Sequence, residues 1–456
     1  MPHVSLNPAT NQVMQTYSSC DAQRLSQILE KTRSAQQPWA QTPYAMRAKV
    51  LHDVAARLRA QRDQYATLIT LEMGKPLREA RAEVEKCAGV CDYYARHGED
   101  YLRAEPVESD AGKSYVAYYP LGVVLAVMPW NFPFWQVFRA AAPALMAGNA
   151  LLLKHAPNVP QCALALEAIF RESGLPEGLA TTLMIEVGQV AEAIASPHVH
   201  AVTLTGSEAA GRQVAACAGQ HLKKCVLELG GSDPFIVLHD ADLELTANMA
   251  AASRFMNCGQ SCIAAKRFIV VPQIADEFLR ALKIKMGALK LGDPMSEATQ
   301  IGPMARLDLR DSLHRQVTDS IAQGAVAVAG CNPVERQGFF YQPSILDHVT
   351  AKTRAYHEEL FGPVATVIRA ESEQDALRIA NETRFGLGSS IWSKDVARAE
   401  RLAASIQAGC TFINGMVKSD PRLPFGGIKA SGYGRELSKL GILEFVNAKT
   451  VWIRQA

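Results

Sequence analysis

The alternation of apolar and polar positions divides the chain into two parts. Between about residues 21 and 100, apolar side chains recur at helical spacing with charged residues between them, which predicts long amphipathic helices. The clearest examples are residues 45–73 and 77–102. Beyond about residue 113 the pattern changes to short apolar runs bounded by Gly, Pro or Asn, which are typical of buried strands.

These short runs alternate with helical segments. The predicted strands and helices of a first unit are, in order, 123–128, 133–148, 150–155, 162–174, 201–206 and 207–222. After the turn-rich segment 228–234 (ELGGSDP), a second unit contains the predicted strands 233–238, 267–271, 365–370, 389–392 and 410–414 and a helix over 277–291. Such alternation predicts an α/β fold with parallel sheets, which bind ligands at the carboxyl ends of their strands. Segment 228–234 is a candidate domain boundary.

Two further segments need a separate interpretation. Residues 114–122 and 445–454 are rich in β-formers and isolated, and we expect them to pair as a small ribbon outside both units. Residues 121–138 carry no charge, but Pro129 and Pro133 interrupt the run and Asn131 lies between them. A buried strand, a loop and a buried helix fit this pattern better than a membrane span.

Composition narrows the function classes. A chain of 456 residues with 48% apolar and 20% charged residues suggests two or three globular domains. Its net charge of +2 argues against a nucleic-acid-binding protein with a broad basic surface. Ten scattered cysteines without a CxxC pair predict neither a disulfide framework nor a zinc site, so we expect free thiols, no metal and a reducing compartment. The N-terminus lacks a signal-peptide pattern, and we expect a cytoplasmic protein.

Four positions could carry chemistry, and each has a plain alternative. Cys262 is a candidate nucleophile or an inert buried thiol. Glu228 ends an apolar run and is either a desolvated general base or a strand-end carboxylate facing solvent. The amide of Asn131 either donates to a developing oxyanion or forms a turn with its own backbone. Gly206 and Ser207 join a strand to a helix N-terminus, which suits a phosphate but is a weak signal alone.

Taken together, these residues lie in a series of motifs that resembles the aldehyde dehydrogenase superfamily over nearly the full length. The matching segments, in order, are PWNFP (129–133), APALMAGNALLLK (142–154), GLPEG (174–178), TLTGSEAAG (203–211), ELGGSDP (228–234), F-x-N-x-G-Q-x-C (255–262), EELFGPV (358–364), ANETRFGL (380–387) and PFGGIKASGYGRE (424–436).

The resemblance implies a catalytic mechanism. Cys262 would attack an aldehyde, and the side-chain amide of Asn131 would hold the oxyanion. Hydride transfer to a nicotinamide would leave a thioester, which water activated by Glu228 would hydrolyse. Two other classes remain: a Cys/Glu amide or nitrile hydrolase, which would need no dinucleotide, and a non-catalytic relative. Turnover that depends on a dinucleotide separates all three.

The resemblance also implies the residues that hold NAD or NADP. Lys154 would reach the adenosine ribose, Gly206 and Ser207 would form the phosphate turn, and Trp130 and Leu229 would line the cleft. Glu359 would hold the nicotinamide ribose, with Phe361 beside it.

One position bears on the choice of dinucleotide. Relatives restricted to NAD often carry a glutamate where this chain has Pro157. Without that carboxylate a 2′-phosphate meets no like charge, so we expect NADP to be tolerated.

The substrate pocket is expected on the helix that contains Trp135 and Arg139. Arg139 is the only charge in an Ala-rich segment and needs an anionic partner, which is either a protein carboxylate or a substrate carboxylate. The chain most resembles the shorter bacterial succinate-semialdehyde dehydrogenases, in which the matching arginine and a loop serine, here Ser419, face the substrate carboxylate. Met256 replaces a second arginine of some relatives, so glutarate semialdehyde or uncharged aldehydes are alternative substrates.

The resemblance implies the following organisation. We expect a Rossmann-type dinucleotide-binding domain (1–112 and 127–227), an α/β catalytic domain (228–436) and an oligomerisation β-ribbon (113–126 and 437–456). Exposed strand edges on that ribbon predict a homodimer or homotetramer. The expected partner is a small aldehyde that carries a carboxylate, and neither nucleic acid nor a membrane.

Overall fold

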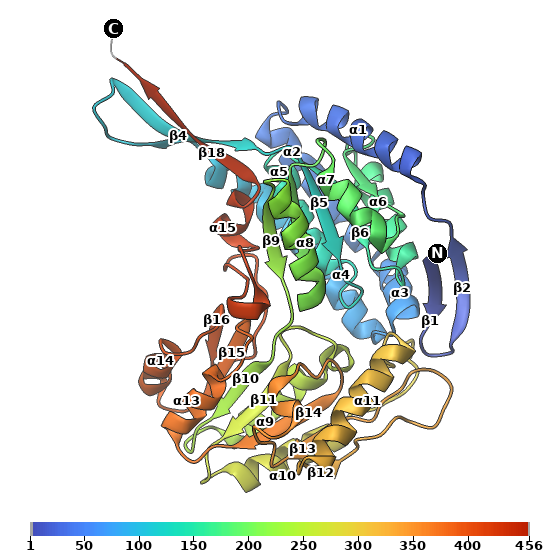
Figure 1. Ribbon diagram of the computed structural model, residues 1–456, viewed down its shortest axis with the longest axis vertical. Helices are drawn as coiled ribbons and strands as arrows, with labels where there is room; N and C mark the ends of the chain where they lie inside the picture. The colour runs from blue at the N-terminus through green and yellow to red at the C-terminus, as the bar shows by residue number, and fades with distance from the viewer. Residues whose placement is uncertain (1–2, 455–456) are drawn as a thin grey trace.

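A computed structural model describes residues 3–454, which form an upper and a lower α/β body (Figure 1). The upper body contains a six-stranded sheet in the order β17-β9-β8-β5-β6-β7. Its strands are β5 (Val123–Met128), β6 (Ala150–His155), β7 (Ala180–Thr182), β8 (Ala201–Thr205), β9 (Lys224–Glu228) and β17 (Gly432–Tyr433). Five strands are parallel and β17 joins antiparallel to β9, so the C-terminal part of the chain returns to the first sheet.

Helices cover this sheet because its strands are apolar along their whole length. All six residues of β6 are buried, as expected for a parallel strand with both faces covered. The helices of this half are α1 (Ala22–Trp39), α2 (Tyr44–Ala60), α3 (Arg62–Met73), α4 (Leu77–Leu102), α5 (Trp135–Met146), α6 (Pro160–Glu172), α7 (Val190–Ala195) and α8 (Glu208–Gln220). Every residue of α5 is buried, which places this helix inside the body.

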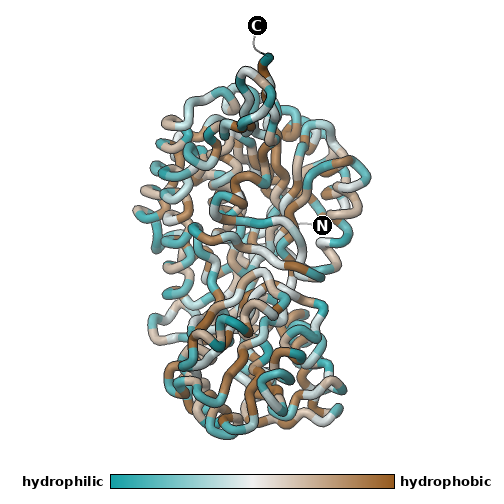
Figure 2. Tube along the Cα trace, turned by 90° about the vertical axis from the view of Figure 1, so that its left-hand side faces the viewer, coloured by the Kyte–Doolittle hydropathy of each residue, from teal (hydrophilic) through white to brown (hydrophobic). Residues whose placement is uncertain are grey.

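The lower body contains a seven-stranded sheet in the order β12-β13-β14-β11-β10-β15-β16. Its strands are β10 (Asp233–Val237), β11 (Ala265–Val270), β12 (Val326–Ala329), β13 (Ser344–Asp347), β14 (Val364–Arg369), β15 (Gly388–Trp392) and β16 (Cys410–Ile413). Only β12, at one edge, runs antiparallel to its neighbour. The helices are α9 (Leu243–Phe255), α10 (Ala275–Gly287), α11 (Leu307–Ala322), α12 (Arg354–His357), α13 (Glu373–Asn381) and α14 (Val396–Ala403). In Figure 2 the strands at the centre of each body are the most hydrophobic parts of the trace.

The predicted ribbon is confirmed. Strands β4 (Lys113–Pro120) and β18 (Val446–Ile453) pair antiparallel over their whole length, and β3 (Glu105–Pro106) adds a short third strand. The ribbon projects from the upper body, with α15 (Ser438–Leu443) at its base (Figure 1). Tyr119, Trp452 and Ile453 on it are each 45% or more exposed, which is unusual for large apolar side chains.

The N-terminal hairpin was not predicted from the sequence. Strands β1 (His3–Asn7) and β2 (Gln12–Tyr17) lie beside α3, and their turn reaches the lower body. There the amide N–H of Phe339 donates to the carbonyl of Pro8 at 2.9 Å. The hairpin therefore connects the two halves, a contact between distant segments that no local pattern reveals.

The α/β fold with mostly parallel sheets agrees with the sequence-based prediction, with local differences. The predicted helix 45–73 is two helices, because the backbone leaves the helical region at Gln61 (φ −111°, ψ 22°). Residues 123–126, assigned above to the ribbon, begin β5, because the turn before Val123 already ends the ribbon strand. Residues 432–433, assigned to the catalytic domain, pair with β9. The division into domains otherwise stays a prediction, and residues 1–2 and 455–456 lie outside the described residues.

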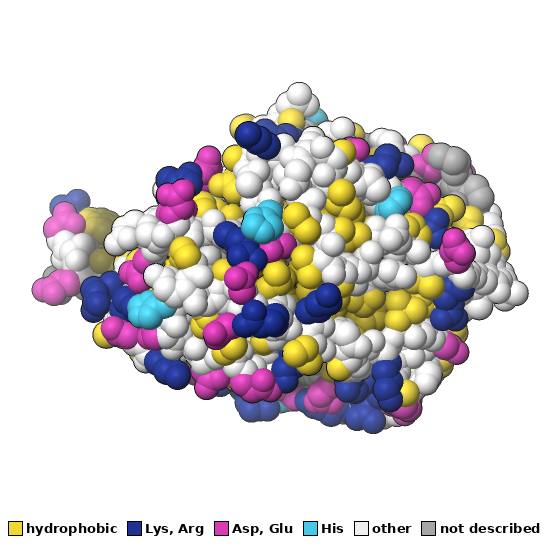
Figure 3. Space-filling view, turned by 90° about the horizontal axis from the view of Figure 1, so that it is seen from below, with side chains coloured by type: hydrophobic (Ala, Val, Ile, Leu, Met, Phe, Trp, Pro, Cys, Tyr) yellow, Lys and Arg dark blue, Asp and Glu magenta, His cyan; other side chains and the backbone are white. Residues whose placement is uncertain are grey.

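The surface carries both signs of charge. On the face shown in Figure 3, Lys and Arg side chains alternate with Asp and Glu, which fits the net charge of +2. Within residues 3–454, no helix combines the length and apolar character that crossing a membrane requires. All ten cysteines are free.

Candidate active site

A cavity of about 220 Å³ lies where α4, α5, the loop before β11 and the loop after β16 meet. It brings together four residues that the sequence singled out, namely Cys262, Trp135, Arg139 and Ser419. The remaining lining residues are Glu79, Ala82, Glu83, Lys86, Phe132, Gln136, Met256, Ser261, Ile263, Met416, Val417, Lys418 and Phe425. Met256 stands in the wall where some relatives were expected to place a second arginine.

The loop that carries Cys262 is held by two buried cations. The ammonium of Lys266 donates to the carbonyls of Ser261 (2.9 Å) and Cys262 (2.8 Å). The guanidinium of Arg254 donates to the carbonyl of Gly259 at 2.8 Å. Gly259 has a left-handed backbone (φ 69°), and a Cβ there would collide with the neighbouring backbone, so only glycine fits this turn. Sequence analysis did not predict the role of Arg254.

Burial dominates the chemistry of the Cys262 thiol. Burial raises the pKa of Cys262 to about 12, while the nearby charges of Arg139 and Lys266 lower it. The sulfur is therefore protonated at neutral pH, and the two cations are the groups that favour its thiolate.

Glu228 is buried rather than exposed to solvent. It is the last residue of β9, and its side chain is 2% exposed. Neither carboxyl oxygen has a hydrogen-bond partner among residues 3–454. Burial, with a smaller contribution from the nearby Glu436 carboxylate, raises the pKa of Glu228 to about 8, while Arg139 opposes the shift. A carboxyl group in this state exchanges its proton close to neutral pH, as a general base requires.

Asn131 lies in the loop between β5 and α5 and is hydrogen-bonded to the loop of Cys262. Its side-chain amide donates to the carbonyl of Gln260 at 3.0 Å, and the side-chain amide of Asn257 donates to the carbonyl of Asn131 at 2.8 Å. An amide NH₂ group has two hydrogens. One hydrogen of Asn131 holds this contact, and the second remains for an acceptor.

The start of α5 is held by a carboxylate that the sequence did not reveal. Glu83 of α4 accepts hydrogen bonds from the backbone N–H groups of Phe134 (2.9 Å) and Trp135 (3.0 Å). Its other oxygen forms a fully buried ion pair with Lys75. These bonds satisfy free N–H groups at the start of the helix and place a negative charge at its positive end. The available signal was a charged residue on the apolar stripe of the predicted helix 77–102.

Arg139 has a protein carboxylate as its partner. Its Nε forms an ion pair with Glu436, and both side chains are 2% exposed. Its Nη2 donates to the hydroxyl of Thr205 at 3.3 Å, and the guanidinium lies over the ring of Phe425 at 4.7 Å. Within residues 3–454, no protein hydrogen bond involves Nη1. Arg139 thus lines the cavity with its charge already balanced.

The predicted Trp135 and Ser419 meet at a third residue, Lys86 of α4. The Ser419 hydroxyl oxygen accepts from the indole N–H of Trp135 at 3.1 Å and from the ammonium of Lys86 at 2.7 Å. The ammonium also lies 4.1 Å from the centre of the Trp135 indole. Sequence analysis missed Lys86 because a half-buried lysine on an amphipathic helix has the pattern of an ordinary surface residue.

The predicted cofactor residues follow the carboxyl ends of the first sheet. Lys154 lies near the end of β6, and its ammonium donates to the carbonyl of His155 at 3.0 Å. Ser207 caps α8 by accepting from the amide of Ala210 at 3.3 Å, directly after Gly206. Leu229 packs closely on α8, since a Cβ at position 211 would lie 2.5 Å from a methyl group of its side chain. Pro157 is exposed in the loop after β6.

The remaining predicted cofactor residues lie in two facing loops. The rings of Trp130 and Phe361 meet edge to face with centroids 5.8 Å apart. The carboxylate of Glu359 is 3.0 Å from the ammonium of Lys266, which also holds the cysteine loop. The amide nitrogen and oxygen of Asn158, next to Pro157, are both shielded from solvent without a partner in the described chain. An unpartnered polar group at this strand end fits a site that a polar ligand completes.

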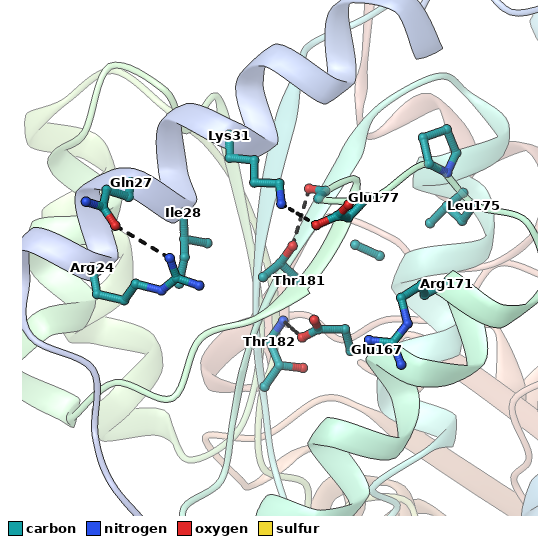
Figure 4. Close-up of a pocket in the computed structure, with 13 residues that line it drawn as sticks. Arg24, Gln27, Ile28, Lys31, Glu167, Arg171, Leu175, Glu177, Thr181 and Thr182 are labelled. Atoms are coloured by element: carbon teal, nitrogen blue, oxygen red, sulfur yellow. Dashed lines mark hydrogen bonds and ion pairs between the residues drawn. The ribbon is translucent and has the colours of Figure 1, made fainter.

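A second cavity lacks these features. It has a volume of about 320 Å³ and lies against α1, α6 and β7 (Figure 4). Lys31 and Glu177 form an ion pair of 2.5 Å there, and Glu167 accepts from the amide of Thr182 at 2.7 Å. No cysteine or histidine lines this cavity, so we assign the reacting centre to the cavity of Cys262. Residues 3–454 contain no group of three or more His, Cys, Asp or Glu side chains placed to hold a metal ion.

Comparisons with known proteins agree with this geometry. Residues 3–451 match the model of the aldehyde dehydrogenase family. A probable succinate-semialdehyde dehydrogenase (NADP+) of Synechocystis sp. is 50% identical, with 99% of this chain and 100% of that protein covered. A succinate semialdehyde dehydrogenase (NAD(P)+) of Escherichia coli is 46% identical, with 98% and 97% covered. The crystal structure of succinic semialdehyde dehydrogenase from Streptococcus pyogenes with NADP+ has a TM-score of 0.97 and 39% identity, with 99% and 100% covered.

Proposed function

The chain belongs to the aldehyde dehydrogenase family, and we propose that it oxidises succinate semialdehyde to succinate with NAD+ or NADP+. The observation that carries this proposal is the single cavity that holds the Cys262 thiol together with a set of cationic and polar side chains. A four-carbon aldehyde with a terminal carboxylate needs both features.

Cys262 is the proposed nucleophile. Its sulfur attacks the aldehyde carbon, and the free hydrogen of the Asn131 amide donates to the oxyanion that forms. Arg139 and Lys266 favour the thiolate, because both charges lower the pKa of Cys262 against the effect of burial. Lys266 also fixes the Cys262 carbonyl, so the backbone cannot turn away during the attack.

Glu228 is the proposed base for hydrolysis. Once the thiol proton has passed to solvent, attack by the thiolate gives the oxyanion. Loss of a hydride from that oxyanion leaves a thioester on Cys262, and Glu228 takes a proton from the water that attacks it. The acid and the free thiol are the products. With a pKa of about 8, Glu228 is a stronger base than an ordinary carboxylate and still partly ionised near neutral pH.

The residues at the carboxyl ends of β6 and β8 fit a dinucleotide. Lys154, Ser207 and the unpartnered amide of Asn158 would bind its adenosine and phosphate groups, and Glu359 would bind its second ribose. The bound nicotinamide supplies the oxidising step by accepting the hydride. The exposed Pro157 adds no negative charge beside Lys154, which supports the use of NADP as well as NAD.

Trp135, Arg139 and Ser419 are the proposed contacts of the substrate carboxylate, since all three line the cavity of Cys262. We also propose that the ribbon of β4 and β18 pairs with a second copy in a homodimer or homotetramer. Its exposed Tyr119, Trp452 and Ile453 support this part of the proposal.

Steady-state kinetics test the function. We expect kcat/KM to be highest for succinate semialdehyde, lower for glutarate semialdehyde and lowest for butanal, which lacks the carboxylate. Each aldehyde is measured with NAD+ and with NADP+. Equal values for succinate semialdehyde and butanal, or a higher value for glutarate semialdehyde, would overturn the assigned substrate. Hydrolysis of an amide or nitrile without a dinucleotide would overturn the reaction class.

A further inference from the structure

The charged side chains around the Cys262 cavity differ in whether they have partners. Glu83 is paired with Lys75, and Arg139 is paired with Glu436. Lys86 is different, because no carboxylate among residues 3–454 lies within ion-pair distance of its ammonium.

The other two charges of the lining are less suited to hold a substrate anion. Glu79 carries a carboxyl group, which has no positive charge to offer, and it accepts from the amide of Asn257 at 2.7 Å; burial raises its pKa to about 7. Lys418 is exposed, so solvent screens its charge. Lys86 is therefore the half-buried cation of this cavity whose charge the described residues leave unbalanced.

The hydroxyl of Ser419 is left as a donor. Its oxygen already accepts two hydrogen bonds, from Lys86 and from Trp135, and a hydroxyl oxygen accepts no more than two. No described residue accepts the hydroxyl hydrogen. One hydrogen of the Lys86 ammonium bonds Ser419, and two remain. Lys86 and Ser419 thus present free donors side by side, and a carboxylate provides acceptors for both.

We propose that Lys86 is the residue that supplies the positive charge for the substrate carboxylate, with the Ser419 hydroxyl as its co-donor and Trp135 fixing both. This inference rests on the proposed function, since it assumes an aldehyde with a terminal carboxylate. Arg139 can still contact that carboxylate through Nη1, but Glu436 balances its charge. The net attraction for the anion comes from α4 rather than from α5.

The alternative is that Lys86 only orients Ser419 and the loop after β16. A positioning role would affect every aldehyde that enters the cavity, whereas binding of the carboxylate affects only aldehydes that carry one. The ratio of kcat/KM for succinate semialdehyde to kcat/KM for butanal separates the two roles, because effects on the chemical steps cancel in it.

The experiment compares three variants of the full chain with the wild type. Lys86→Met keeps the length and apolar stem but removes the charge, and Lys86→Arg keeps a charge. Lys283→Met removes a lysine from the exposed surface of α10 and is the matched control. We expect Lys86→Met to lower the ratio by about 10- to 100-fold, as for the loss of one hydrogen bond between charged groups, mainly through KM. Lys86→Arg retains most of the ratio, and Lys283→Met retains all of it.

The pH dependence of the wild-type ratio gives a second readout, which does not require any variant to fold. Burial and the charge of Arg139 lower the pKa of Lys86 to about 8, while Cys87, Glu83 and Asp420 oppose the shift. In the wild type the ratio should therefore fall as pH rises through about 8, because Lys86 loses its charge. In Lys86→Arg it should stay level, since arginine remains protonated.

The outcomes are distinct. If the wild type itself does not prefer succinate semialdehyde to butanal, the proposed function fails. If the wild type prefers it and Lys86→Met keeps that preference, the role of Lys86 is overturned and the function stands. An equal loss for both aldehydes also overturns carboxylate binding by Lys86. If Lys86→Met does not fold, a wild-type ratio that stays level from pH 7 to 9 overturns the proposal.

Discussion

The buried charged side chains around Cys262 are of two kinds, those with a partner of opposite charge and those without one, and the two kinds have different roles. The pairs Lys75–Glu83, Arg139–Glu436 and Lys266–Glu359 are matched within the protein, and the last two join segments far apart in the sequence. Glu228 and Lys86 have no partner of opposite charge within ion-pair distance in residues 3–454. The matched pairs hold the walls of the site, whereas the unmatched groups remain available to water and substrate.

The difference has an energetic basis. A charge removed from water is destabilising unless a partner compensates it, and removing one member of a buried pair leaves the other uncompensated. An unmatched buried charge therefore lowers the stability of the fold. A functional role of that residue explains why the charge is present. Substitution of a matched residue should mainly lower stability, while substitution of an unmatched residue should mainly lower activity.

The largest expected effect comes from removing the unmatched carboxylate. Glu228→Gln keeps the shape of the side chain but cannot accept a proton, so steady-state turnover should fall by about 10²- to 10⁴-fold, the usual contribution of a general base. Thermal stability should stay the same or rise, because a desolvated titratable group is gone. Turnover and thermal unfolding measured on one preparation check both parts, and retained turnover would exclude Glu228 as the base.

A matched charge should give the opposite result. Arg139→Met leaves Glu436 buried without its partner and should lower the free energy of unfolding by about 3–5 kcal/mol. Denaturant unfolding measures this loss. The control is Arg139→Met combined with Glu436→Gln, which removes both charges and should recover most of the stability. If the single and double variants are equally stable, the pair does not contribute as described.

The smallest expected effect comes from adding a charge. Pro157→Glu places an unmatched carboxylate in the exposed loop that follows β6. Repulsion of a 2′-phosphate should lower kcat/KM for NADP+ by about 10-fold relative to NAD+, since like charges facing each other oppose binding. The ratio of the two values measures the effect, with Pro157→Gln as the uncharged control. An unchanged ratio would show that position 157 does not face the adenosine ribose.

Sequence analysis predicted the regular elements well because their signals are local. The apolar runs at 123–128 and 150–155 are strands β5 and β6 with the same bounds. The break at Gln61 was not predicted, because the apolar spacing continues across it into α3. The resemblance also named Cys262, Trp135, Arg139 and Ser419, which lie around one cavity, because a family resemblance carries three-dimensional information that periodicity does not.

The partners of the charges could not be predicted. Arg139 pairs with Glu436, and Lys86 donates to Ser419. In both contacts the two residues are separated by more than half of the sequence, and no spacing rule connects such positions. Lys86 has the appearance of a surface lysine until the fold places a serine and an indole beside it. Which charges are matched is a property of the tertiary structure, and it therefore could not be predicted from the sequence.

The most direct test compares the two cations in one assay. The ratio of kcat/KM for succinate semialdehyde to kcat/KM for butanal is measured in Lys86→Met and in Arg139→Met combined with Glu436→Gln. The account predicts that the ratio falls by about 10- to 100-fold in Lys86→Met and by much less in the double variant, whose removed charges already balance each other. A larger fall in the double variant than in Lys86→Met would contradict the account. Arg139, rather than Lys86, would then be the cation that binds the substrate carboxylate.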